Sequence, residues 1–576
     1  MNPNSEFHIF RDSRRQVRAA ELVAHLHADL LRMPGSARLD DILNALLRAG
    51  ELECALADGS ASDDDAVAAS ELTTFLGQLA VTCDAEVVPH NARMLSAACL
   101  RVVRKIKFTD TVSLSTPEGF AHYALHPLDY ADLVTRVKIR SQVVFVVGIR
   151  SIGTILSGVV CAKLRQLGIN AERTTVRPSG HPYQRHCQFA DSQRQAIVRA
   201  RNANAEFIVC DEGPGRSGSS LLSVAEALEG EGVAADHILI LCSHEPDVSS
   251  LCAPNAARRW RRYRCAAAGM TRRLPASAEC CAGGGEWRRY LLGAPESWPA
   301  VWPQMERLTY VSSDECELLT FEGHGAYGAA AAARNDALSS SGLGPRYLGY
   351  DAGFGRHLMP RGPSLGRGLS SEVLNRIPKY CAWRAREFAV THADASDLEQ
   401  MAQTNFAREF GAELEDFELG VERPTVCDNR MTQQYWLGYD GSQILKLDGA
   451  IHGDDHFFPG PCDIGWDLAG AIVEWELSPD ARESLLAHYR RFSGDDIARR
   501  LSSYELAYAA FRLGWSKMAA ASTPEAEENA RLLFDARRYR RILQRLTGYR
   551  TRQSSPLRAA ARAPQARETS AAPELL

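Results

Sequence analysis

Two adjacent carboxylic acids that follow a short apolar run are the first residues of this chain that could do chemistry. The stretch FIVCDEGPGRSGSS spans residues 207–220, and its apolar start reads as a buried strand that ends at Asp211 and Glu212. In an open parallel sheet, ligands bind at the carboxyl ends of the strands. A helix-like segment follows, and its start favours a phosphate because backbone N–H groups are free there. The residues at that helix start are Ser217, Gly218, Ser219 and Ser220. Two carboxylates beside a phosphate-binding turn could accept hydrogen bonds from the two hydroxyls of a sugar diol.

A second loop of this kind lies earlier in the chain. VVFVVGIRSIGTILSGVVCAKL places residues 148–153 between a predicted strand and a predicted helix. Arg150 would bring positive charge to an anion, and Ser151 and Gly153 would let that anion approach the backbone closely. VRPSGHPYQRH (176–186) adds basic side chains between the two loops. Either loop alone is more often a plain turn. Both together, in this order, indicate a site for a phosphorylated sugar.

The arrangement resembles the ribose-5-phosphate signature of type I phosphoribosyltransferases over roughly residues 100–265. In that family two acids precede a Thr-Gly-Gly-Thr-like cluster, which Asp211-Glu212 and Ser217–Ser220 match here, with a connection about one residue longer. The resemblance implies that the loop at Arg150 holds the diphosphate of 5-phosphoribosyl diphosphate (PRPP). It also implies that a loop containing Arg177, His181, Arg185 and His186 closes over that diphosphate. Taken singly, the two histidines are better read as surface loop residues.

The C-terminal half contains its own series of acids. Asp428 stands in VERPTVCDNRMTQQYWL, and Asp448 follows the apolar run ILKL after a predicted hairpin. Asp463 and Asp467 come next, in PCDIGWDLAG. Phosphoryl transfer needs one carboxylate near the acceptor hydroxyl and another on Mg²⁺. Because a hairpin brings its two ends together, we expect the carboxylates of Asp428 and Asp448 to face one cleft.

This order resembles the aminoglycoside phosphotransferase and protein-kinase-like fold. The resemblance implies that Asp428 is the catalytic acid, that Asp448 binds the metal and that Asp467 braces the catalytic loop. Gln433 or Gln434 takes the place of the family's second metal ligand, an Asn. CELLTFEGHGAYG (316–328) matches the strand that holds the nucleotide-phosphate Lys, but Thr320 stands at that position. We therefore expect a low affinity for nucleotides.

Two further stretches have more than one interpretation. HGDDH (452–456) could bind a metal, although a solvated loop is the better interpretation. The polar and aromatic stretch 106–127 could cover the phosphoribosyl acceptor, or it could be a packed connection.

Several elements must position these residues. Apolar strands alternate with amphipathic helices from about 100 to 265, which predicts a parallel sheet covered on both faces. Residues 16–56 read as helices, and ADGSASDDDAVA (57–68) reads as a polar linker. The predicted class is α/β, with a helical N-terminal segment and a C-terminal two-lobed α+β kinase-like domain. The predicted divisions are a helical segment with an acidic linker (1–99), a phosphoribosyltransferase-like domain (100–270), a linker (271–299), a kinase-like domain (300–550) and a disordered tail (551–576).

Bulk composition narrows the classes of function. The chain has 576 residues and a net charge of −5, which gives no indication of a nucleic-acid or membrane partner. No signal peptide or apolar run of membrane-spanning length is evident. Its 15 cysteines are scattered and contain no CxxC pair, as expected for free thiols in a reducing cytoplasm.

The leading hypothesis is a cytoplasmic enzyme that transfers ribose 5-phosphate from PRPP to a nucleophile with Mg²⁺. Its kinase-like domain would phosphorylate a related small molecule, with ATP as the candidate donor. The only partners expected are small-molecule substrates, and the sequence leaves the acceptor and the oligomeric state open. The alternative hypothesis is a regulatory protein that senses PRPP or a nucleotide without catalysis. Pyrophosphate release from PRPP distinguishes the two.

Overall fold

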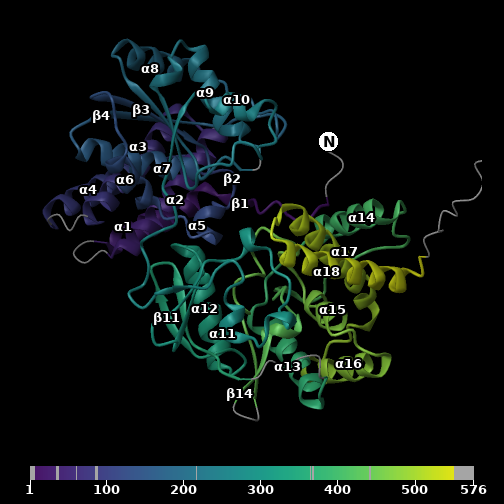
Figure 1. Ribbon diagram of the computed structural model, residues 1–576. Helices are drawn as coiled ribbons and strands as arrows, with labels where there is room; N and C mark the ends of the chain where they lie inside the picture. The colour runs from purple at the N-terminus through teal and green to yellow at the C-terminus, as the bar shows by residue number, and fades with distance from the viewer. Residues whose placement is uncertain are drawn as a thin grey trace, which may run out of the picture.

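The computed structural model describes residues 7–549 except 34–37, 60, 85–88, 216, 363–364, 366–368 and 440–442. These residues form a mixed α/β structure with one five-stranded parallel sheet, one five-stranded antiparallel sheet and many helices (Figure 1). The mixed class and the parallel sheet expected from the sequence are confirmed. The tail expected to be disordered, 551–576, lies outside the described residues.

Four helices and a strand make up the N-terminal part. They are β1 (Arg15–Arg18), α1 (Ala19–Arg32), α2 (Leu39–Asp58), α3 (Asp63–Asp84) and α4 (Pro89–Val103). The strand β1 pairs antiparallel with β2 (Thr111–Leu114), which tethers the start of this part to the segment before the parallel sheet.

The acidic stretch 57–68 is not the linker that its composition predicted. Helix α2 continues to Asp58, and α3 begins at Asp63. The Ser62 hydroxyl accepts the N–H of Asp65 at 3.2 Å and donates to its carboxylate at 2.7 Å, which caps the helix. Acids in a first turn also suit the helix dipole. The same residues that suggest a solvated linker therefore begin a helix.

Helix α3 is long and apolar enough to cross a membrane, unlike any other helix among the described residues. Half of its apolar window is buried inside the protein, where it packs against α2, α4 and α7 (Ile152–Gln166). A Cβ added at Gly77 would lie 2.9 Å from the Gly158 backbone, so α3 and α7 are in close contact. This packing is that of a core helix.

The parallel sheet has the strand order β4-β3-β5-β6-β7. Its elements, with the connecting helices, are α6 (Pro127–Arg136), β3 (Val143–Ile149), β4 (Asn170–Val176), α8 (Asp191–Asn202), β5 (Glu206–Cys210), α9 (Ser219–Gly230), β6 (Ile238–Cys242), α10 (Ala256–Trp260) and β7 (Arg264–Ala267). The chain passes from β3 to one side for β4 and then to the other side for β5. The strand order therefore reverses between β3 and β5, and such a point is where open α/β sheets bind ligands.

Alternate residues of the sheet enter two different cores. Val146 and Ile208 pack with α2, α3 and α7 on one face, whereas Val147 and Val209 pack with α8 and α9 on the other. The central strands β3 and β5 are therefore apolar on both sides, which explains the continuous apolar runs in their sequences.

The C-terminal half combines an antiparallel sheet with a helical part. The sheet has the order β11-β12-β10-β9-β8 and is packed against α12 (Ala326–Ser340). Its strands are β8 (Cys280–Cys281), β9 (Thr309–Val311), β10 (Glu317–Phe321), β11 (Tyr347–Asp351) and β12 (Phe354–Leu358). The helices are α13 (Ser371–Glu387), α14 (Ser396–Phe410), α15 (Gly465–Glu474), α16 (Pro479–Ser493), α17 (Ala498–Ser522) and α18 (Ala526–Thr547). Two short ribbons join them: β13 (Pro424–Val426) with β16 (Pro461–Asp463), and β14 (Trp436–Tyr439) with β15 (Gln443–Lys446).

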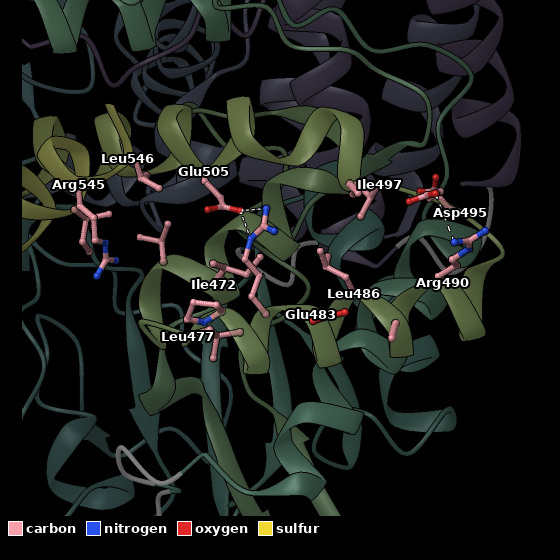
Figure 2. Close-up of a pocket in the computed structure, with 17 residues that line it drawn as sticks. Ile472, Leu477, Glu483, Leu486, Arg490, Asp495, Ile497, Glu505, Arg545 and Leu546 are labelled. Carbon is pink, nitrogen blue, oxygen red and sulfur yellow. Dashed lines mark hydrogen bonds and ion pairs between the residues drawn. The ribbon is translucent and has the colours of Figure 1, made fainter. Parts of the chain in front are cut away.

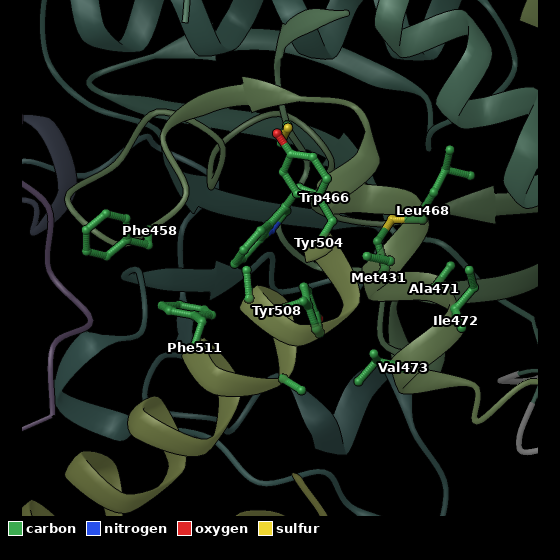
Figure 3. Packing of buried hydrophobic residues seen from close by; sticks show 14 of the residues in the cluster. Met431, Phe458, Trp466, Leu468, Ala471, Ile472, Val473, Tyr504, Tyr508 and Phe511 are labelled. Atoms are coloured by element: carbon green, nitrogen blue, oxygen red, sulfur yellow. The ribbon is translucent and has the colours of Figure 1, made fainter. Parts of the chain in front are cut away.

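Helix α15 lies at the centre of the helical core (Figure 3). The Trp466 ring lies 5.2 Å from the Tyr508 ring and 5.7 Å from the Phe511 ring, both on α17. Its indole N–H donates to the Asn429 side chain at 3.0 Å. The core thus fixes α15 against the loop that contains Asp428. Trp436 and Trp475 are also buried, as expected for core residues.

The segment expected to be a linker, 271–299, contributes structure to the C-terminal half. Cys280 and Cys281 pair with β9 as the edge strand β8, and Arg288–Leu291 form the short helix α11. Its Gly- and Ala-rich composition predicts a loop. The strand β8 has only two residues, which is too short to give a recognisable sequence pattern.

One five-residue helix, α5 (Glu118–His122), lies between the two halves (Figure 1). The N–H of His324 donates to the Phe120 carbonyl at 2.9 Å. Arg307 donates to the Ala121 carbonyl at 3.3 Å and to the carbonyl of Ile451 at 2.6 Å. The stretch 106–127 is therefore at least a packed connection.

Candidate functional sites

The acid pair lies at the carboxyl end of β5, beside the point where the strand order reverses. The Asp211 carboxylate accepts the backbone N–H of Gly153, at the start of α7. The Glu212 carboxylate rests on α5, because a Cβ added at Gly119 would lie 2.7 Å from its oxygen. The Tyr130 hydroxyl donates to the Asp211 carbonyl at 2.7 Å and holds this turn in place.

Both carboxyl groups have pKa values above the usual range for acids. Burial raises the pKa of Asp211 to about 7, and hydrogen bonds and the charge of Arg177 oppose this only in part. Burial, followed by the charges of Asp211 and Glu118, raises the pKa of Glu212 to about 8. Acids with strongly perturbed pKa values cluster at functional sites, which makes this pair a candidate site.

The predicted phosphate cradle does form a helix start. Gly218 has φ 68° and precedes Ser219, the first residue of α9, so the left-handed turn needs its glycine. The Ser217 hydroxyl donates to the Pro182 carbonyl at 2.9 Å, and the Ser219 hydroxyl donates to the same carbonyl at 2.5 Å. Ser220 follows in the first turn, while Arg216 lies outside the described residues. The basic loop 176–186 thus lies on the cradle.

The loop at Arg150 lies at the same edge of the sheet. A Cβ added at Gly153 would lie 2.3 Å from the Cys210 carbonyl oxygen, so β5 and this loop touch backbone to backbone. Ser151 has φ 104°, a conformation that costs about 1–3 kcal/mol in a non-glycine residue. Strain of this kind concentrates where a backbone is held for binding. The structure therefore brings the predicted residues of the first site together.

In the C-terminal half, Asp428 is fully buried among charged and polar partners. Its carboxylate contacts Lys446 Nζ at 3.0 Å and the Tyr380 hydroxyl, with Arg384 at 3.9 Å. Burial lowers the pKa of Lys446, and the charge of Asp428 acts in the opposite direction. This network seals the proposed catalytic acid away from solvent.

The predicted bracing of the loop by Asp467 corresponds to observed hydrogen bonds. Its carboxylate accepts the N–H of Asp428 at 2.9 and 3.0 Å and that of Asn429 at 3.1 Å. Asp463 does the same for the preceding turn, accepting the N–H groups of Glu422 and Arg423 at 2.8 and 2.7 Å. Both acids therefore fix backbone.

Asp448 lies in a different environment. It lines a cavity of about 80 Å³ with Thr320 and Glu322, between the antiparallel sheet and the residues Tyr435 and Leu447 that flank the β14–β15 ribbon. Its carboxylate accepts from His452 Nε2 at 2.8 Å. The positive environment of His452, Arg430 and Lys446 holds the Asp448 pKa well below its usual range, despite burial. The cavity is far smaller than the 300 Å³ or more typical of nucleotide-sized ligands.

The second predicted metal ligand lines a different cavity from the first. Gln433 and Gln434 line a separate, open cavity of about 1500 Å³ near α18, which Asp448 does not line. The buried Asp428 lines neither of these two cavities. A Cβ added at Gly449, the residue after Asp448, would nevertheless lie 3.4 Å from the Asp428 carboxylate. The shared cleft for Asp428, Asp448 and Gln433 stays a prediction.

The HGDDH loop packs into the protein. His452 contacts Asp448 at 2.8 Å and Asp455 at 3.4 Å, and His456 contacts the Tyr123 hydroxyl at 2.8 Å. Across the described ranges, no group of three or more His, Cys, Asp or Glu side chains is placed to hold a metal ion. All 15 cysteines are free thiols.

Sequence reasoning missed Lys446 and Asp58. Lys446 interrupts the apolar run ILKL two residues before Asp448, and that interruption was the available signal. Asp58 pairs with Arg150 at 2.8 Å across 92 positions of sequence, for which no local pattern exists.

Another groove in the helical part lies away from these residues (Figure 2). It has a volume of about 830 Å³ and lies among α15–α18, with Leu486, Glu505 and Leu546 in its wall. None of the predicted site residues lines it.

No protein-family profile and no curated protein matches this chain. Several solved structures match part of this chain at low similarity. The choline kinase LicA from Streptococcus pneumoniae is 13% identical, with a TM-score of 0.30 over 45% of this chain and 93% of that one. An ethanolamine kinase from Plasmodium vivax is 10% identical, with a TM-score of 0.25 over 41% and 79%. A choline/ethanolamine kinase family protein from Mesorhizobium loti is 15% identical, with a TM-score of 0.26 over 46% and 97%.

Proposed function

We propose that the parallel-sheet part is a PRPP-dependent phosphoribosyltransferase. The observation that carries this proposal is the convergence of the acid pair, the strained Ser151 loop and the α9 start at the strand-order reversal. In the reaction, the bond from ribose C1 to the diphosphate breaks, a bond from C1 to the acceptor forms and pyrophosphate leaves.

Each group at the site has a role in this proposal. The α9 start with Ser217 and Ser219 binds the 5-phosphate once Pro182 has moved away. Arg150 and Arg177 stabilise the charge that develops on the departing diphosphate. Asp211 and Glu212 accept hydrogen bonds from the ribose hydroxyls. The oxygen donors of the acid pair, short of cationic partners, also fit Mg²⁺, which supplies charge neutralisation for the diphosphate.

The acid pair offers a direct test. Changing Asp211 to Asn and Glu212 to Gln together removes charged acceptors, each worth about 1.5–3 kcal/mol in a hydrogen bond. We expect PRPP affinity, measured by calorimetry with Mg²⁺, to fall at least tenfold, and pyrophosphate release with a panel of bases and amines to be lost. Unchanged affinity would reject the site. PRPP binding with no release in the unaltered protein would instead favour the sensing alternative.

Phosphoryl transfer to a small molecule in the C-terminal half is a second candidate function. It is favoured by the position of Asp448 opposite Thr320 in one cavity and by the bracing of Asp428 by Asp467. The seal formed by Lys446 over Asp428 opposes it in this conformation. Asp448 and Gln433 line different cavities, so one Mg²⁺ held by both stays a prediction.

The test is ADP release from ATP with amino alcohols, sugars, nucleosides and aminoglycosides as acceptors. We expect Asp448→Asn to reduce any turnover at least a hundredfold. Asp454→Asn is the matched control, since Asp454 lies in the neighbouring loop and does not line the Asp448 cavity. ATP binding without turnover would assign this half to nucleotide sensing.

A further inference from the structure

A cavity of about 340 Å³ lies where the end of α2 meets the carboxyl ends of β3 and β4. Cys54 and Asp58 line it from α2, and Ser151 and Arg177 line it from the sheet side. Ser113 and Ser115, from the stretch that could cover the acceptor, close it on a third side. The cavity is therefore continuous with the site of the proposed function.

A single carboxylate holds two arginines in this cavity. Asp58 Oδ1 lies 2.8 Å from Arg150, and Asp58 Oδ2 lies 2.6 Å from Arg177 Nε. The side chains of Arg150, Asp58 and Arg177 are 18%, 30% and 40% exposed. In this cluster one negative charge thus faces two positive charges, at the place where a diphosphate is expected. Arg14 and Glu51, one charge of each sign, line the rest of the cavity.

The helix does not favour that carboxylate. Asp58 is the last residue of α2, and the last turn contains no basic residue. A negative charge at a helix C-terminus opposes the helix dipole. Partly exposed ion pairs also contribute little stability, about 0–1 kcal/mol each. An anion with more charge than one carboxylate can therefore displace Asp58 from the two arginines.

Cys54, four residues earlier on the same face of α2, covers a second group. The N–H of Ser151 donates to the Cys54 sulfur at 3.3 Å. A thiol sulfur is a weak acceptor, and burial raises the Cys54 pKa to about 11, so the thiol stays neutral. A phosphate oxygen would be a much stronger acceptor for this N–H, which the strained φ of Ser151 holds in place.

We propose that the last turn of α2 is an internal plug that occupies the diphosphate subsite. Asp58 takes the place of an anion on Arg150 and Arg177, and Cys54 covers the N–H of Ser151. A sugar diphosphate binds by displacing Asp58 from both arginines. This inference rests on the proposed function for the identity of the ligand, but the competition itself concerns any diphosphate.

The test is Asp58→Asn in the full chain, with inorganic pyrophosphate as the probe in calorimetry. We expect pyrophosphate affinity to rise five- to tenfold, and Arg177→Gln to abolish that gain. Asp191→Asn, which removes an exposed acid paired with Arg194 in the same part of the protein, should leave affinity unchanged. Circular dichroism checks that each variant is folded.

The outcomes separate the plug from the proposed function. Unchanged or weakened pyrophosphate binding in Asp58→Asn would overturn the plug, because Asp58 would then position the arginines rather than compete for them. A gain in pyrophosphate affinity without any phosphoribosyl transfer from PRPP would keep the plug and reject the proposed function. PRPP turnover with no gain would reject the plug alone.

Discussion

Asp211 and Glu212 lie in an environment that is unusual for carboxylic acids. Their pKa values of about 7 and 8 exceed the usual range for acids because burial disfavours the charged form. In an unfolded chain both groups lose their protons near pH 4. Between about pH 4 and 8, the folded state therefore binds more protons than the unfolded state.

This difference predicts a pH dependence of stability. The contribution of the pair to the free energy of unfolding should fall as pH rises from about 4 to 8 and then level off, by on the order of 2–4 kcal/mol for each group. In the double variant Asp211→Asn, Glu212→Gln these two side chains do not titrate. Its melting temperature should therefore fall less between pH 5 and 8.5 than that of the unaltered protein. Parallel melting profiles for the two proteins would contradict the raised pKa values.

At the scale of elements, Asp467 on α15 is a backbone clamp. It holds the N–H groups of Asp428 and Asn429, whereas Asp463 just before α15 holds those of Glu422 and Arg423. Changing Asp467 to Ala should speed amide exchange at 428 and 429 by about a hundredfold, as a clamp worth on the order of 3 kcal/mol is lost.

Asp463→Ala is the matched control for this prediction. It removes an equally buried acid from the same segment but should speed exchange at 422 and 423 instead. Equal protection of all four amides in both variants would show that packing, and not the carboxylates, holds the loop.

The elements also show how far the sequence could predict the fold. Strands β3, β4, β5 and β6 could be predicted because three are continuous apolar runs and β4 lies between two clear helices. The start of α3 could not, because Asp63 and its neighbours have the composition of a linker. The contact of Asp58 with Arg150 spans 92 positions and depends on the packing of α2, which no local pattern encodes.

For the molecule as a whole, Arg307 is one of the buried polar contacts that join the halves. It is buried and donates to Ala121 and His122 on α5 and to Ile451 in the C-terminal half. Changing Arg307 to Met leaves buried acceptors without donors, at a cost of about 1–3 kcal/mol each. We expect scanning calorimetry to show the two halves unfolding in separate transitions in this variant and in one transition in the unaltered protein.

Arg334→Met provides the comparison for Arg307. Arg334 also donates to a backbone carbonyl, that of Ala450, and pairs with Asp454, but all of these residues lie in the C-terminal half. Its loss should lower the transition temperature without splitting the transition. A split in this variant as well would mean that the halves are joined by something other than the Arg307 contacts.

Helix α5 contacts both halves, which limits the substitutions that evolution can accept in either of them. Its Gly119 is pressed against Glu212, while its Phe120 and Ala121 carbonyls are engaged by the other half. A recombination event near residues 271–299 would separate the halves along the sequence but leave α5 fitted to a partner it no longer has. Each half therefore constrains which substitutions the other can accept, and the two would be inherited together.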